Sequence, residues 1–117
     1  MIEPAIIGAA RSFSSSYVQV HAQDWENAHQ PPAEALREAA SLGLLSFETP
    51  REYGGAGESF QTKLAICEAL ARADMAFAFA LVNTQNIAAK LAKGTTARHH
   101  RDLITALMRA EVFGATA

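Results

Sequence analysis

Four consecutive polar residues that interrupt an apolar stretch are the clearest candidates for a binding site. Asn83, Thr84, Gln85 and Asn86 follow the apolar run 75–82, and apolar residues resume at position 87. A buried amide without a partner costs about 1–3 kcal/mol, so four such residues in a row are poor core filler. The segment therefore predicts one of two structures. It is either a solvated turn between two shorter helices or the wall of a pocket whose ligand has both apolar and hydrogen-bonding parts.

Two loop carboxylates, Glu48 and Glu52, could form a general acid and base pair. No nucleophile or second perturbing group accompanies them in the sequence, so we expect salt-bridged loop carboxylates instead. The glycines at 54, 55 and 57 lack the preceding strand that a dinucleotide-binding fingerprint requires, and they predict a turn with positive φ. We therefore assign no catalytic residue.

The histidines do not have the spacing of a metal site. His99 and His100 are adjacent on an expected helix and point about 100° apart, so both are expected on the solvated surface. A site that combined His21 and His29 would need a carboxylate such as Asp24, and we do not favour it. We assign no metal ligand.

The composition bounds the class of protein. A chain of 117 residues suits one domain, and the large share of alanine among its hydrophobic residues favours closely packed helices. The net charge of -2 does not indicate a surface that binds nucleic acid. Cys67 is the single cysteine, so an internal disulfide is excluded, and we expect Cys67 to be a core residue. The longest apolar run, 75–82, is far shorter than the roughly 20 residues of a membrane span. Without a secretory signal, a cytoplasmic protein is expected.

Helices must position these residues, and the apolar periodicity predicts an all-α, orthogonal or up-down bundle of about five helices. The first is expected over 3–21, with the serines at 14–16 on its outer face, and residues 24–30 are expected to form a loop. A second helix starts near Pro32 and ends at Gly43 as a left-handed cap. Residues 44–58 show no helical period and predict a second loop.

The remaining helices have recognisable ends. Ser59 and Asp74 are expected N-caps, Gly94 ends the long helix 75–93, and Thr95 or Thr96 caps the last one. The residues at 112–117 predict the beginning of a strand. The expected buried stripes are Leu64, Cys67, Leu70 and Ala71 on one helix and Leu103, Ile104, Leu107 and Met108 on the last.

The order of several short motifs resembles the N-terminal helical domain of the acyl-CoA dehydrogenases. The family has a helix like Leu36-Arg-Glu-Ala-Ala-Ser-Leu-Gly and a loop like Pro50-Arg-Glu-Tyr-Gly-Gly-Ala-Gly. A helix with Leu70-Ala-Arg-Ala-Asp follows, then Gly94-Thr opens another helix, and Glu111-Val-Phe-Gly-Ala-Thr-Ala closes the match. Each motif alone is weak, but the ordered combination across about residues 33–117 is specific.

The resemblance implies a function that the residues alone do not. In the family, the buried helix forms one wall of the fatty-acyl tunnel, and the cofactor is FAD. The residues after Glu111 correspond to the start of a strand whose backbone meets the flavin in the family, which places Thr116 near the isoalloxazine ring. The full-length enzyme would dehydrogenate an acyl-CoA thioester in fatty acid metabolism, pass electrons to a transfer partner, and form a homo-oligomer. The residues that alignment on Gly94 places at the tunnel are Phe77, Ala78, Leu81 and Val82, with Asn83 and Gln85 beside them.

The family's flavin motif, Thr-Glu-x-x-x-Gly-Ser-Asp, its β-domain and its C-terminal bundle with the catalytic base would follow Ala117. We therefore expect residues 1–117 to form one N-terminal-like domain that is inactive alone and retains no flavin. Two alternatives stay open. One is a stand-alone helical module that docks onto a partner chain, and the other is the N-terminal domain of a related flavin-dependent monooxygenase.

Overall fold

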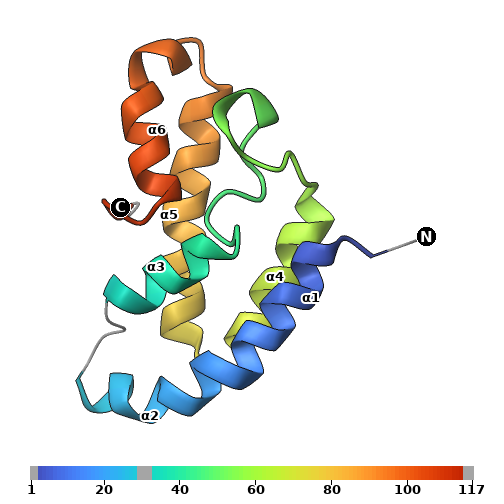
Figure 1. Ribbon diagram of the computed structural model, residues 1–117, viewed down its shortest axis with the longest axis vertical. Helices are drawn as coiled ribbons and strands as arrows, with labels where there is room; N and C mark the ends of the chain where they lie inside the picture. Colours follow the sequence, from blue (N-terminus) through green and yellow to red (C-terminus); the bar gives the residue numbers. More distant parts are fainter. Residues whose placement is uncertain (1–2, 29–32, 115–117) are drawn as a thin grey trace.

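A computed structural model describes residues 3–28 and 33–114, and these residues form helices and connecting loops without a strand. The all-α prediction is confirmed. The expected strand at 112–117 is absent as far as Gly114, and its last three residues lie outside the described part of the chain. The elements in Figure 1 are α1 (Ala5–Phe13), the π-helical η1 (Ser14–Val18), α2 (Gln19–Asn27), α3 (Ala33–Ser41), the 3-10 turn η2 (Arg51–Tyr53), α4 (Phe60–Ala71), α5 (Met75–Lys93), the 3-10 turn η3 (Ala97–His100) and α6 (Arg101–Met108).

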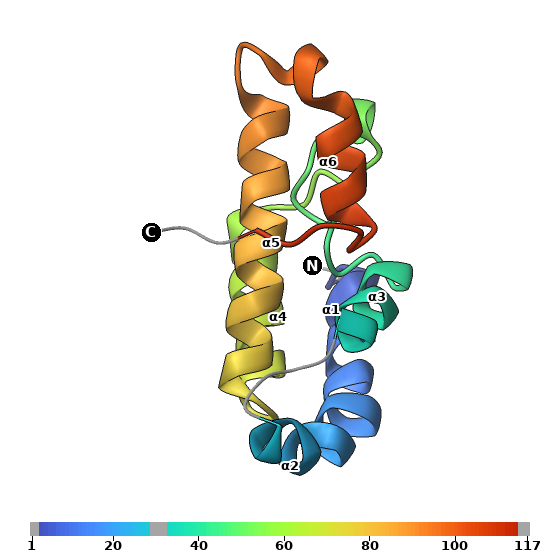
Figure 2. The ribbon, with the colours of Figure 1, turned by 90° about the vertical axis from the view of Figure 1, so that its left-hand side faces the viewer.

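The longest helix, α5, connects the two ends of the molecule. Its N-terminal half lies beside α4, and α6 runs back along its C-terminal half (Figure 2). On its other side α4 packs against α1, so α4 lies between two helices. No helix in the described ranges is both long and apolar enough to cross a membrane.

The first helical run is longer than the sequence predicts. It continues from Ala5 through a π-helical segment to Asn27, so the loop expected over 24–30 is wrong as far as it is described. His29 and the start of the second helix at Pro32 lie outside the described residues. Trp25 is buried on α2, and its ring stacks on Phe77 with 5.2 Å between centroids. Burial of this large ring outweighs the poor helix propensity of the neighbouring Asp24 and Asn27.

The π-helical segment places one serine inside the protein. Ser15 and Ser16 are exposed as expected, but Ser14 is buried and its hydroxyl donates to the carbonyl of Ala69 at 2.6 Å. The prediction that all three serines lie outside is therefore wrong for Ser14. Its hydrogen bond links η1 to the last turn of α4, where backbone carbonyls need donors from outside the helix.

Ser14→Ala is expected to lower the free energy of unfolding by about 1–3 kcal/mol, because the Ala69 carbonyl loses a buried donor. The measurement is urea denaturation followed by circular dichroism. Ser15→Ala is the matched control, since that hydroxyl is exposed and donates within its own helix; its change should stay below about 0.5 kcal/mol. Equal losses in the two variants would contradict the assigned role of Ser14.

The helix ends agree largely with the sequence. Ser59 accepts from the N–H of Thr62 at 3.3 Å, and Asp74 accepts from the N–H of Phe77 at 2.8 Å. Gly94 ends α5, and Gly43, two residues after the end of α3, has a φ of 84°. Thr96 occupies the N-cap position of η3, but its side chain makes no capping hydrogen bond, so that expected cap is not formed.

The buried stripes of two helices are shifted from their predicted positions. Leu64 on α4 is 54% exposed and Leu103 on α6 is 43% exposed, although both were expected in the core. Cys67 is only half-buried. Because α4 carries apolar residues on several sides and lies between α1 and α5, apolar periodicity alone does not determine which side is covered. The residues that α4 buries are Thr62, Ile66, Ala69 and Leu70.

Candidate functional site

The polar segment of α5 is helical throughout and does not form a turn. Residues 83–86 lie in the middle of the unbroken helix Met75–Lys93, which contradicts the solvated-turn interpretation. Thr84 and Gln85 are buried, and Asn83 and Asn86 are half-buried. The structure must therefore supply hydrogen-bond partners for these side chains.

Gln85 obtains its partners from the loop before α4 and from the neighbouring Asn86 on α5. Its Oε1 accepts from the backbone N–H of Glu48 at 3.2 Å, and its Nε2 donates to Oδ1 of Asn86 at 3.1 Å. A second, longer contact joins Nε2 to Oε1 of Glu48 at 3.5 Å. The buried amide is thus fully engaged and fixes the loop against α5.

Lys63 of α4 completes this polar network. Its Nζ donates to Oε1 of Glu48 at 2.9 Å and to Oδ1 of Asn86 at 3.2 Å. The two charged side chains are only 16% and 12% exposed, so the ion pair is partly desolvated. Glu48 is therefore a salt-bridged loop carboxylate as predicted, and its partner Lys63 is mostly shielded from solvent. Glu52 is exposed.

Thr84 connects α5 to the last described residues of the chain. Its Oγ1 accepts from the backbone N–H of Gly114 at 3.1 Å. A Cβ at position 114 would overlap the end of the Ile87 side chain, so glycine permits this close approach without displacing Ile87. The segment after α6 thus passes directly over the polar segment of α5.

The residues that the resemblance places at the acyl tunnel divide into two groups. Phe77, Ala78 and Leu81 are buried in the core of this domain. Val82 and Asn83 are half-buried and retain surface that a ligand could contact. Their part in binding stays a prediction, and Thr116 lies outside the described residues.

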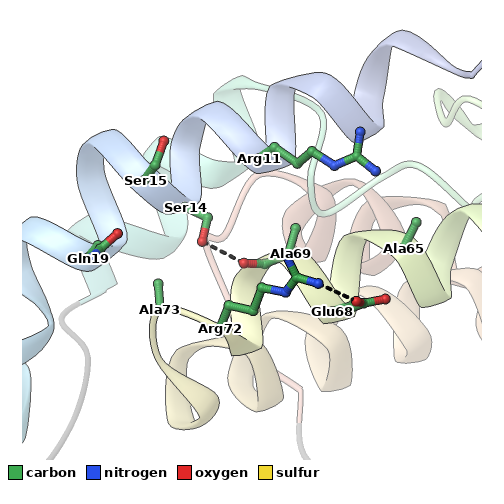
Figure 3. Close-up of a pocket in the computed structure, with 9 residues that line it drawn as sticks. All are labelled: Arg11, Ser14, Ser15, Gln19, Ala65, Glu68, Ala69, Arg72 and Ala73. Carbon is green, nitrogen blue, oxygen red and sulfur yellow. Dashed lines mark hydrogen bonds and ion pairs between the residues drawn. The ribbon is translucent and has the colours of Figure 1, made fainter.

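A cleft of about 430 Å³ lies between the α1–η1 segment and α4. Among its polar side chains, Ser14 donates to the carbonyl of Ala69, and Arg72 donates to Glu68 at 2.7 Å (Figure 3). The remaining guanidinium, that of Arg11, pairs with Glu3 at 2.6 Å. Because these groups are satisfied internally, we assign no ligand to this cleft.

A second hollow, of about 550 Å³, adjoins the polar network. It lies along the C-terminal half of α5 and is lined by Glu48, Asn86, Ala89 and three lysines, Lys63, Lys90 and Lys93. This hollow is not among the sites predicted from the sequence. A usable signal was present, since Lys90 and Lys93 are three residues apart and therefore share a helix face.

Other reactive groups do not form a site. No cluster of three or more histidine, cysteine or carboxylate side chains suited to a metal occurs within the described ranges, and His99 is exposed. Burial raises the pKa of the Cys67 thiol, which lowers its thiolate fraction and its reactivity at neutral pH. Neither group indicates catalysis.

Residues 3–111 match the family model described as acyl-CoA dehydrogenase, N-terminal domain. No curated protein matches the sequence.

Proposed function

The chain belongs to the acyl-CoA dehydrogenase family through its N-terminal domain, and from that premise we propose that it forms one wall of the acyl pocket in a flavin-dependent enzyme. The reaction is the α,β-dehydrogenation of an acyl-CoA thioester. The observation that supports this role is α5, a long helix whose apolar N-terminal half meets a fixed polar segment. Such a helix can contact both the apolar chain and a hydrogen-bonding part of one ligand.

Within this proposal, each part of α5 has a physical task. Phe77 and Leu81 hold the helix rigidly from behind, because both are buried in the core. Val82 offers apolar surface to an acyl chain, and the amide of Asn83 can donate to or accept from a polar ligand group. FAD, when bound, supplies the acceptor for the β-hydrogen, and the residues described here contribute binding and water exclusion.

The test compares the full-length enzyme proposed here with variants of it that are produced in the same way. Val82→Trp is expected to shift the preference toward shorter acyl chains by at least about tenfold in the ratio of kcat/KM values, because added bulk shortens the pocket. Val20→Trp is the matched control, since Val20 is exposed on α2. Absence of thioester dehydrogenation at every chain length would refute the proposed function. An unchanged dependence of kcat/KM on acyl chain length would show that Val82 does not line the pocket.

A stand-alone interaction module is the second candidate, and exposed apolar side chains favour it. Phe60 and Leu64 on α4, and Met75 and Phe79 on the adjacent α5, are all exposed. The members of each pair are four residues apart and share a helix face, and exposed apolar faces mark surfaces that another protein element covers. Sedimentation velocity over a range of concentrations distinguishes this candidate: association of the purified chain would favour it, and a monomer at every concentration would count against it.

A further inference from the structure

All the lysines of the chain line a single hollow. The sequence contains three, Lys63, Lys90 and Lys93, together with seven arginines. The three lysines surround the 550 Å³ hollow beside α5, which we call the lysine groove, and no arginine contributes to it.

The positive charge of the lysine groove is only partly compensated. Glu48 is the one carboxylate that lines it, and its Oε1 is already bound to Lys63 at 2.9 Å. Within the ranges that the structure describes, no carboxylate lies within ion-pair distance of Lys90 or Lys93. The carbonyl end of α5 offsets about half of one charge, which leaves the groove positive.

The three ammonium groups differ in how they are held. Lys63 is fixed by Glu48 and Asn86 and is mostly buried, so its position is set before any ligand arrives. Lys90 and Lys93 are exposed on the last turns of α5 and can move toward a ligand. A fixed cation flanked by two mobile ones suits a compact anion with several acceptor oxygens.

We propose that the lysine groove binds the phosphoryl group of a small phosphorylated ligand. Ammonium groups act as point charges with three donors each, and lysine binds phosphoryl oxygens in this way in other phosphate sites. The cleft in Figure 3 provides the contrast, because there each guanidinium is paired with a carboxylate. This inference rests on the groove alone and holds whether or not the proposed acyl-pocket role is correct.

The experiment observes the lysine side chains directly. In the purified chain labelled with ¹⁵N at lysine Nζ, every side-chain ammonium signal reports on the groove, because no lysine lies elsewhere. Titration with inorganic pyrophosphate should shift these signals and saturate in the millimolar range or below, as expected for a few charge pairs in water. Sodium chloride at matched ionic strength controls for screening.

Two further probes identify the source of the phosphoryl group. Tighter binding of glycerol 3-phosphate than of inorganic phosphate would indicate an organic phosphate monoester, and tighter binding of inorganic phosphate or pyrophosphate would indicate a free phosphate. Either result supports the proposal. Absence of saturable shifts with all three probes, or equal shifts with sodium chloride, would overturn it.

Paired variants test which charges matter. Lys90→Gln combined with Lys93→Gln should weaken pyrophosphate binding at least tenfold, and Lys90→Arg combined with Lys93→Arg should retain it because the charge remains. Arg98→Gln, at an exposed position in η3, removes a charge outside the groove and should leave binding unchanged. Equal weakening by Arg98→Gln would show that net charge, and not the groove, attracts the anion.

Discussion

Phe77→Ala is expected to lower the free energy of unfolding by about 3–5 kcal/mol, the range for truncating a fully buried phenylalanine. Phe77 has no exposed surface, and its ring lies 5.2 Å from that of Trp25 and 6.0 Å from that of Phe13, between centroids. Truncation therefore removes the centre of an aromatic cluster that joins α5 to the first helical run. Guanidinium chloride denaturation followed by circular dichroism gives the value.

Phe79→Ala is the control on the same helix. Phe79 is two residues further along α5 and 67% exposed, so its truncation should change stability by less than about 0.5 kcal/mol. A similar loss in both variants would mean that α5 is rotated relative to the structure described here. A loss at Phe79 alone would place that side chain, and not Phe77, in the core.

This pair of variants also bears on the proposed acyl pocket. Phe77, Ala78 and Leu81 serve the core of the domain, so a ligand can reach them only if the core opens. The same argument rules out bulky probes at Ala78, where a large side chain would strain a packed interior. Val82 and Asn83 are the predicted wall residues that still have accessible surface.

Local signals in the sequence predicted local structure correctly. The N-caps at Ser59 and Asp74 and the end of α5 at Gly94 depend on residues within a few positions, so sequence patterns identify them. The positive φ at Gly54 and Gly57 follows equally from a loop that must turn sharply. The all-α class followed from the periodicity of the long segments.

Features that depend on distant partners could not be predicted. The burial of Ser14 requires the Ala69 carbonyl, 55 positions away, and the network of Gln85 requires Glu48, 37 positions away. Nothing near either residue in the sequence indicates these contacts. The shifted buried stripe of α4 also depends on distant partners, because α1 and α5, which pack against α4, determine which of its residues are covered.

Gly55→Ala is expected to lower the free energy of unfolding by about 3 kcal/mol or more, at or above the upper end of overpacking costs. A Cβ at this position would overlap the backbone carbonyl of Thr49, which is itself fully buried and cannot move aside as a flexible side chain could. The loop is folded back on itself here: the Gly55 N–H donates to the Pro50 carbonyl at 3.2 Å, and the Gly57 N–H donates to that of Thr49 at 3.0 Å.

Gly8→Ala, in contrast, is expected to raise the free energy of unfolding. Gly8 lies within α1, and a Cβ there would meet no atom within 4 Å, so alanine should stabilise the helix by about 0.5–1 kcal/mol. Thermal unfolding of both variants distinguishes steric overlap from a general effect of replacing glycine.

The loop that contains Gly55 also carries Glu48. If Gly55→Ala displaces this loop, the hydrogen bonds of Glu48 to Lys63 and Gln85 should weaken. A neutral Gly55→Ala would show that this loop does not pack against Thr49 and that the polar network on α5 is held in some other way.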